Sequence, residues 1–331
     1  MRSPFKAALL VCGAAALATA LVQPASADPA QSVAATDITA VGSDTIQFAD
    51  DAIATAYNAT TPTPTKLYDS WDAVNPTTGA VHDSITIKPG VSIQRPDGSS
   101  EGISALQTNT NVDVARSSRG PQAGDVDSSG NPLLFLPFAE DELRYASATT
   151  TNAPQSLTTA QLVSIYTCTA TTWTQVGGSS ADTIHPVIPQ SGSGTRSFFL
   201  KTLGNITPGT CVSTVQENDP TAEAGNADAI GPFSVAQFTS RFSGAGIQLN
   251  TNGTAGTGYD QFREVYHVVV LDPTSGTVAQ ALWPLLGDGS GSGTTGFVCS
   301  TAGQTVVHNQ GFSSLDTTHF PNAACGLAEH I

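Results

Sequence analysis

The sequence predicts an α/β fold with largely parallel sheets, because helical and strand patterns alternate along the chain. Apolar residues recur at helical spacing over 45–54 and again over 158–166, and Ser43 or Asp44 is a candidate N-cap for the first helix. Short runs rich in β-branched and aromatic residues separate these segments. The predicted strands are 112–115, 133–139, 184–189 and 265–271.

The first 27 residues have the features of a secretory signal peptide. Arg2 and Lys6 precede an apolar run over 7–22, and Ala25-Ser26-Ala27 fits the small-residue cleavage site. A membrane-spanning helix is the alternative, but the run is short for one. We therefore expect cleavage after residue 27 and a secreted, extracellular protein. The remaining 331 − 27 = 304 residues are enough for two lobes of ordinary size.

The chain after residue 27 is strongly acidic. Two of the 12 basic residues and none of the 27 acidic residues precede the cleavage site, so the formal charge becomes 10 − 27 = −17. Without a basic patch to release counterions, nucleic acid and anionic membrane surfaces are poor partners. Acidic runs such as Asp50-Asp51 and Glu140-Asp141-Glu142 are interpreted as solvated faces.

Four cysteines follow the predicted cleavage site, and an even number in an exported chain indicates disulfides. Sequence proximity favours Cys168–Cys211 and Cys299–Cys325 among three possible connectivities. A zinc site is the alternative, but there is no Cys-x-x-Cys spacing, and the six histidines show no paired ligand spacing. We expect no metal and no cofactor.

The segment Ser-Gly-Ser-Gly-Thr-Arg, residues 191–196, lies between a predicted strand and a predicted helix. Such a turn exposes unpaired backbone N–H groups at a helix N-terminus, where the dipole favours an anion. Ser193 and Thr195 can add hydroxyl donors, and Arg196 can add a full positive charge. An ordinary Ser/Thr N-cap is the alternative. The esterase elbow and the phosphate loop of nucleotide-binding proteins need different spacings, so we predict no catalytic residue.

Three segments resemble, in their order and spacing, the phosphate-binding proteins of bacterial ABC importers. These segments are 157–166, 172–178 and 191–199. Four shorter stretches are similar to that family's other binding loops and to its late Ile-Gly-aromatic strand. They are 41–45, 97–102, 112–119 and 229–233, so the resemblance covers about residues 40 to 235.

The resemblance implies a two-lobe periplasmic-binding-protein (type II) fold, with mixed or parallel sheets flanked by helices and a ligand cleft between the lobes. It implies lobe bounds of 28–139 plus 265–331 for the first lobe and 140–264 for the second. The implied function is that of a secreted, non-enzymatic solute-binding protein that holds phosphate or a similar oxyanion for ABC import. The expected partners are the oxyanion, with phosphate favoured, and an ABC permease. We expect a monomer.

The family's binding loops carry over to this chain as hydroxyl and N–H donors at several helix starts. Together with Arg196, the candidate ligand-binding residues are Ser43, Asp44, Thr45, Ser99, Ser100, Ser117, Ser118, Ser193, Gly194, Thr195 and Arg196.

Two positions depart from the family's pattern. The family usually has an arginine four residues before the position of Ser193, where this chain has Pro189, and Arg196 is the candidate replacement. The family's third loop often ends in an aspartate that accepts a proton from hydrogen phosphate. This chain has Ser118 there, and Asp44 is the candidate replacement. Loss of such an acceptor could broaden specificity or change the ligand, because the acceptor rejects fully ionised anions.

Two other functions stay open. A binding-protein fold could be repurposed for interaction with a cell surface or an extracellular polymer, which a hydroxyl-rich surface of low charge favours. A secreted hydrolase that uses Ser193 would need a general base within hydrogen-bond reach, and no motif supplies one.

Overall fold

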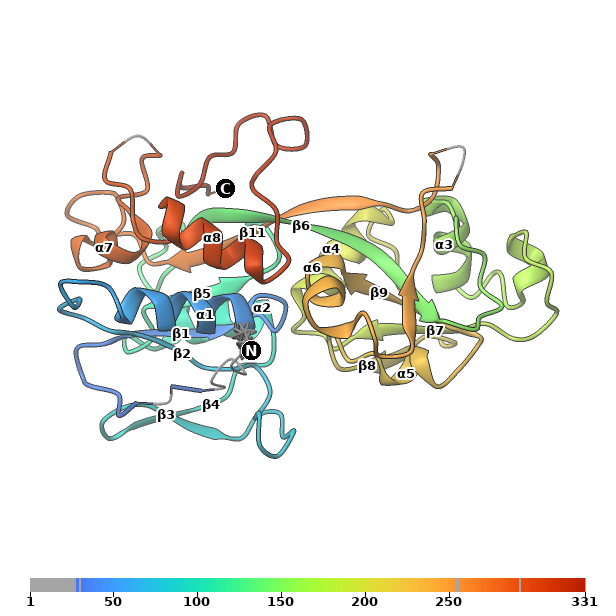
Figure 1. Cartoon of the computed structure of the whole chain (residues 1–331), viewed down its shortest axis with the longest axis horizontal. Coiled ribbons are helices and arrows are strands. Elements are labelled where there is room, and N and C mark those ends of the chain that lie inside the picture. Colours follow the sequence, from blue (N-terminus) through green and yellow to red (C-terminus); the bar gives the residue numbers. More distant parts are fainter. Residues whose placement is uncertain (1–27, 30, 254–255, 292, 331) are drawn as a thin grey trace, which may run out of the picture.

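Two lobes lie side by side in the computed structural model, and long strands pass from one lobe to the other (Figure 1). The structure describes residues 28–29, 31–253, 256–291 and 293–330. The predicted signal peptide, residues 1–27, lies outside the described residues. The crossing strands are β6 (Leu134–Ala148) and β11 (Gln261–Val269), which pair with each other in antiparallel orientation.

The first lobe contains one end of a sheet that has nine strands in the described part of the chain. β1 (Ile38–Gly42) pairs parallel with β2 (Tyr68–Ser70) and β5 (Val114–Ser117), and β5 pairs antiparallel with β11. β3 (Ser84–Lys88) and β4 (Val91–Gln94) form a separate hairpin. The helical elements of this lobe are α1 (Gln47–Asn58), α2 (Ser99–Thr108), η3 (Gln280–Leu282), α7 (Trp283–Leu286) and α8 (Thr301–Asn309).

The second lobe contains the other end of the same sheet. β6 pairs antiparallel with β9 (Ala229–Ser234) and with β10 (Ile247–Leu249). β7 (His185–Pro189) pairs parallel with both β9 and β8 (Ser213–Val215). The helical elements of this lobe are α3 (Thr159–Tyr166), η1 (Trp173–Val176), α4 (Gly194–Thr202), α5 (Thr221–Ala224), α6 (Val235–Gln237) and η2 (Phe238–Phe242).

The two-lobe α/β fold with a mixed sheet is confirmed, but the expectation of largely parallel sheets holds only for the outer strands. Short strands that are linked through helices are parallel, because a crossover connection returns the chain in the same direction. β6 and β11 run through both lobes in opposite directions, so the central pairs are antiparallel. β6 extends nine residues beyond the predicted strand 133–139 because it forms pairs in both lobes.

Each lobe has its own apolar core. In the first lobe, Ile53 of α1 and Val265 of β11 belong to one buried cluster. In the second lobe, the rings of Tyr166 and Phe199 meet edge to face, with centroids 4.8 Å apart. Separate cores support two lobes, and we propose the bounds implied by the resemblance. These bounds are 28–139 plus 265–331 for the first lobe and 140–264 for the second.

The helix starts show where local sequence decides the structure and where tertiary contacts do. Thr158 caps α3 in a reciprocal capping box with Gln161, as an N-terminal Thr with Gln three residues later favours. The predicted cap of α1 is wrong, because Ile46 occupies the N-cap position and no side chain caps the helix. Ser43 and Asp44 instead make hydrogen bonds to residues far away in the sequence.

Both predicted disulfides are present, one in each lobe. Cys168 is bonded to Cys211 and Cys299 to Cys325, across sequence separations of 43 and 26 residues. Within the described ranges, no group of three or more His, Cys, Asp or Glu side chains is arranged to hold a metal ion. None of the helices described is long and apolar enough to cross a bilayer.

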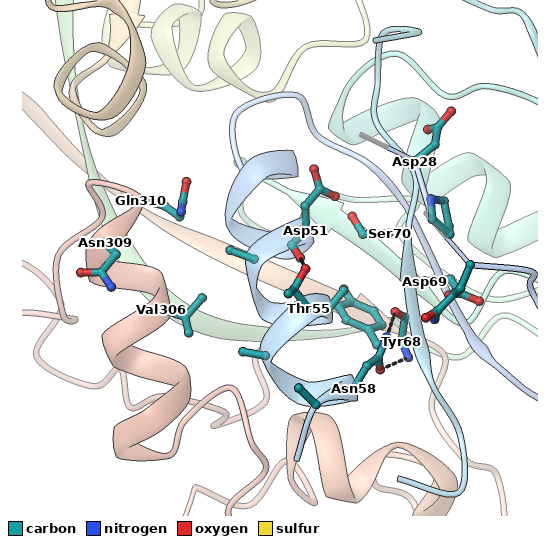
Figure 2. Close-up of a pocket in the computed structure, with 16 residues that line it drawn as sticks. Asp28, Asp51, Thr55, Asn58, Tyr68, Asp69, Ser70, Val306, Asn309 and Gln310 are labelled. Carbon is teal, nitrogen blue, oxygen red and sulfur yellow. Dashed lines mark hydrogen bonds between the residues drawn. The ribbon is translucent and has the colours of Figure 1, made fainter. Parts of the chain in front are cut away.

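A cavity of about 920 Å³ lies beside α1 in the first lobe (Figure 2). Asp51 and Thr55 of α1 line it together with Tyr68 of β2 and Val306 of α8. Burial, and after it the neighbouring charge of Asp72, raises the pKa of the Asp51 carboxyl well above its usual range. The candidate residues named from the sequence do not line this cavity.

Candidate functional site

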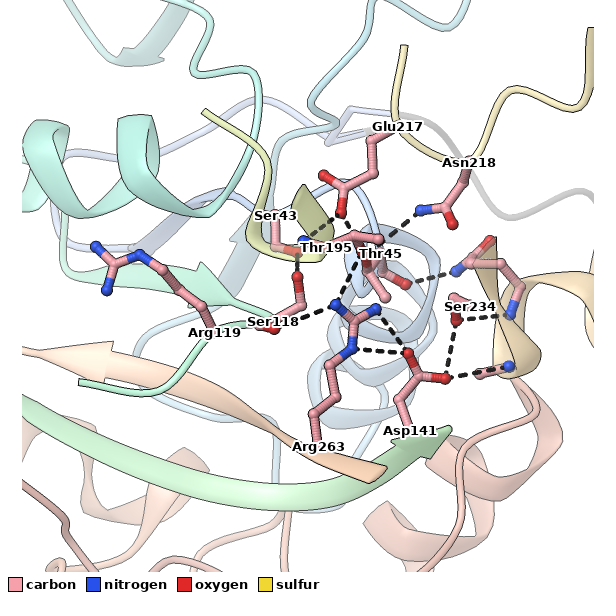
Figure 3. A network of polar contacts seen from close by, with 12 residues as sticks. Ser43, Thr45, Ser118, Arg119, Asp141, Thr195, Glu217, Asn218, Ser234 and Arg263 are labelled. Atoms are coloured by element: carbon pink, nitrogen blue, oxygen red, sulfur yellow. Dashed lines mark hydrogen bonds and ion pairs between the residues drawn. The ribbon is translucent and has the colours of Figure 1, made fainter. Parts of the chain in front are cut away.

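Segments far apart in the sequence meet where the two lobes touch (Figure 3). The first lobe contributes the turn before α1, the start of α2 and the loop after β5. The second lobe contributes the start of α4 and the loop after β8, and Arg263 of β11 joins them. We call this group the interlobe cluster, and it consists of Ser43, Thr45, Ser99, Ser118, Thr195, Glu217 and Arg263. Each of these residues is at most 2% exposed.

Hydroxyl groups within the interlobe cluster hydrogen-bond to one another. The Oγ of Ser118 lies 3.1 Å from Ser43 Oγ, which donates to it, and 3.3 Å from Ser99 Oγ. Between the lobes, Thr45 Oγ1 and Thr195 Oγ1 lie 3.3 Å apart. The structure therefore brings together five of the predicted hydroxyl-bearing residues, which are Ser43, Thr45, Ser99, Ser118 and Thr195.

The start of α4 is shaped for close contact between the lobes. Ser193 is the N-cap, and its Oγ accepts a hydrogen bond from the N–H of Arg196 at 3.0 Å. This side chain is thus used as an ordinary cap, which was the alternative interpretation of the motif. At Gly194, an added Cβ would clash with the Oγ atoms of Ser99 and Ser118. The first turn of α4 can approach the first lobe this closely because position 194 has no side chain.

Arg263 of β11 provides the positive charge of the interlobe cluster. Its Nη1 donates to Thr195 Oγ1 at 2.8 Å and to the carbonyl of Ser118 at 3.3 Å. Its Nε and Nη2 bind Oδ2 of Asp141, which lies opposite it in β6, at 3.0 and 2.7 Å. Asp141 also accepts from Ser234 Oγ at 2.9 Å. A buried ion pair with these additional hydrogen bonds fixes the guanidinium beside Thr195.

The remaining candidates lie near the interlobe cluster but bond elsewhere. Arg196 Nη1 donates to the carbonyl of Pro189 at 2.8 Å. Ser117 Oγ donates to the carbonyl of Arg119 at 2.7 Å, and Ser100 Oγ accepts from Arg119 Nε at 3.2 Å. The structure therefore places Arg263, rather than Arg196, against Thr195.

A carboxylate from the second lobe lies among the donors. Oε1 of Glu217 accepts from Thr45 Oγ1 at 2.9 Å and from the N–H of Thr195 at 3.1 Å. Its Oε2 is buried and has no hydrogen-bond partner among the described residues. One carboxylate oxygen thus bridges a hydroxyl of the first lobe and a helix N-terminal N–H of the second.

Further acidic groups surround the interlobe cluster. Asp44 accepts from Asn218 Nδ2 at 2.8 Å. Burial, and after it the charge of Glu217, raises the pKa of Asp44 well above its usual range. Burial also raises the pKa of Asp97, to which the charge of Glu217 adds. Asp44 and Asp97 therefore hold protons more strongly than exposed carboxyl groups do.

Comparison with known proteins places this arrangement in a family. The family model described as a PBP superfamily domain matches residues 29–282. The chain belongs to the PBP superfamily. Comparison with curated protein sequences found no match.

Solved structures with the same fold include two proteins that are described as components of phosphate transport. A putative phosphate ABC transporter substrate-binding protein with bound phosphate from Clostridium perfringens is 17% identical, with a TM-score of 0.61, and the alignment covers 85% of this chain and 100% of that one. An ABC-type phosphate transport receptor from Vibrio cholerae is 20% identical, with a TM-score of 0.57 and coverage of 84% and 100%. At these identities, the similarity establishes the fold that this PBP superfamily member shares with them.

Sequence reasoning on this PBP superfamily chain found the hydroxyl donors and missed the two charged residues of the interlobe cluster. Glu217 belongs to no motif, and Arg263 precedes the predicted strand 265–271. The acidic run at 140–142 was an indirect signal for Arg263, because Asp141 in that run binds its guanidinium. That run is not a solvated face, because Glu140 and Asp141 are buried. Asp50 and Asp51 are buried as well, which corrects the same interpretation of that pair.

Proposed function

We propose that this protein is a secreted solute-binding protein that holds phosphate, or a closely similar oxyanion, between its lobes and delivers it to an ABC permease. One observation carries the proposal. Thr45 of the first lobe and Thr195 of the second lie in hydrogen-bond contact, with the guanidinium of Arg263 against Thr195. Donors from two lobes around one point suit a small anion with several oxygens.

The helices add to this chemistry. α2 begins at Ser99 and α4 at Gly194, and a Cβ added at Gly194 would meet Ser99 Oγ across the lobe boundary. α1 begins two residues after Thr45. The unpaired N–H groups of a helix start carry partial positive charge. The partial positive charge of three helix starts and the full charge of Arg263 would together stabilise a negatively charged oxyanion in this buried site.

The comparisons support phosphate as the first ligand to test. The Clostridium perfringens protein was solved with bound phosphate. It shares its fold with this chain along its whole length, so phosphate is the first anion to test. The identity of the anion rests on the donors of this chain itself.

The hydrogen bond of Ser193 fits a protein that binds its ligand without a chemical reaction. Its Oγ accepts from the N–H of Arg196 as a helix cap. A nucleophilic serine needs a base that accepts its proton. Among the described residues, no histidine or carboxylate is hydrogen-bonded to Ser193 Oγ.

Isothermal titration of residues 28–331 with phosphate, arsenate, sulfate and molybdate tests the proposal. We expect saturable binding of one oxyanion per chain, with phosphate bound best and recovered unchanged. The absence of a binding signal with all four anions would contradict the proposal that the protein binds an oxyanion. Release of a hydrolysed product from a model phosphate ester, lost in Ser193→Ala, would instead support an enzyme.

A further inference from the structure

Glu217 satisfies the same donors that an oxyanion would need. Thr45 Oγ1 and the N–H of Thr195 both point at its Oε1, at 2.9 and 3.1 Å. A carboxylate at the start of a helix receives the stabilisation that the helix terminus gives to any anion. Glu217 is only 2% exposed, so this contact belongs to the interior between the lobes.

The two neighbours of Glu217 also reach across to the first lobe. Gln216 Nε2 donates to Asp97 Oδ1 at 2.7 Å, and Asn218 Nδ2 donates to Asp44 Oδ1 at 2.8 Å. We call these three consecutive residues, Gln216, Glu217 and Asn218, the interlobe latch. The latch is anchored to its own lobe through the N–H of Glu217, which donates to Gln190 Oε1 at 2.8 Å. Three adjacent side chains thus connect one short segment to the opposite lobe.

The Glu217 carboxylate and an oxyanion cannot both occupy the donors of Thr45 and Thr195. Two negative charges within a few ångströms repel each other strongly in a buried environment. Burial, and after it the charge of Glu217, raises the pKa of Asp44, which also accepts a hydrogen bond from the neighbouring Asn218. Oε2 of Glu217 also lacks a hydrogen-bond partner among the described residues, so its carboxylate is only partly compensated where it lies.

We propose that Glu217 is a built-in competitor for the anion site: its carboxylate occupies the donors of Thr45 and Thr195, and an oxyanion has to displace it to bind. This inference rests on the proposed function. It gives the interlobe latch two effects. It lowers the apparent affinity for the oxyanion, and it holds the lobes together until the anion takes over the same donors.

Glu217→Gln tests the competitor directly, because it removes the charge and keeps the shape of the side chain. Titrated with inorganic phosphate at a fixed neutral pH, this variant should bind about tenfold more tightly than the wild type, since a competing state no longer reduces the competent fraction. Glu217→Asp, whose shorter side chain cannot reach both donors, should also bind more tightly.

Glu223→Gln is the matched control. Glu223 is a buried glutamate of the same lobe, 2% exposed. In the described part of the chain, its side chain makes no hydrogen bond to the interlobe cluster. Its substitution should leave the phosphate affinity unchanged. Unchanged or weaker binding by Glu217→Gln would overturn the proposal, and weaker binding would assign Glu217 the role of accepting a proton from the ligand.

A second measurement needs no ligand. Small-angle scattering without added anion should give a larger radius of gyration for Glu217→Ala combined with Asn218→Ala than for the wild type, because the latch no longer joins the lobes. An unchanged radius would refute the latch. If neither wild type nor Glu217→Gln binds any oxyanion, the proposed function fails and the competitor fails with it, whereas the scattering result still decides whether the latch joins the lobes.

Discussion

Arg263 Nη1 lies 2.8 Å from Thr195 Oγ1, so a strand that crosses between the lobes brings a guanidinium to the first turn of α4. Asp141, on the neighbouring crossing strand, holds the same guanidinium through two of its nitrogens. The charge of the site is therefore set by the pairing of β6 and β11. A local motif around α4 does not provide it, because Arg196 is bonded to the carbonyl of Pro189.

Substitution of this arginine tests the assignment of charge. Arg263→Lys keeps the charge but loses the planar two-nitrogen contact with Asp141, so we expect phosphate binding to weaken by about 1.5–3 kcal/mol. Arg196→Ala is the control and should leave affinity unchanged in the same calorimetric titration. A loss confined to Arg196→Ala would show that the charge comes from α4 instead.

A larger residue at Gly194 should keep the lobes apart. In Gly194→Ala, the new methyl group would meet the Oγ atoms of Ser99 and Ser118. We expect a loss of about 1–3 kcal/mol in oxyanion binding, because overpacked contacts have to shift. Gly244→Ala is a suitable control, since a Cβ there meets no atom within 4 Å. Equal affinity in both variants would mean that binding does not require the observed contact at Gly194.

Stability should depend on pH through Glu223. Burial raises the pKa of this carboxyl from 4.5 to about 7. A raised pKa means that the folded state binds the proton more tightly, so the associated stability is full below pH 4.5 and is lost as the pH rises to about 7. The loss amounts to at most about 3 kcal/mol. Urea unfolding of wild type and Glu223→Gln across this range checks it, and parallel pH profiles would contradict it.

The disulfides should stabilise each lobe without taking part in binding. Removing Cys299–Cys325 by a double serine substitution should lower the free energy of unfolding by roughly 3–4 kcal/mol, because a closed loop restricts the unfolded chain. Phosphate affinity should stay the same, since neither cysteine belongs to the interlobe cluster. A large loss of affinity in a variant that remains folded would link this bond to the site.

The parts of the site that could be predicted are those encoded by local sequence. Ser99, Gly194 and Thr195 belong to short Gly/Ser/Thr segments at helix starts. Each such segment can be recognised in the sequence without knowledge of the rest of the fold. Glu217 and Arg263 could not be found in this way. Each acts through a partner far away in the sequence, across the boundary between the lobes or between two crossing strands.

The same distinction explains the errors in the fold. Thr158 caps α3 through Gln161, three positions away, and the helix predicted over 158–166 is confirmed. Ser43 and Asp44 have the chemistry of helix caps, but their side chains bond to Ser118 and Asn218. Tertiary contacts override a local preference whose contribution is about 1 kcal/mol. The antiparallel pairing of β6 with β11 could not be predicted from local sequence either, because the two strands are more than 100 residues apart.

Phosphate titration of the wild type, Thr45→Val and Thr195→Val tests most directly whether both lobes hold one anion. Valine keeps the shape of threonine and removes the hydroxyl. We predict that each substitution weakens binding by about 1–3 kcal/mol, since each takes a donor from a different lobe. Full affinity in either variant would contradict a single site shared between the lobes.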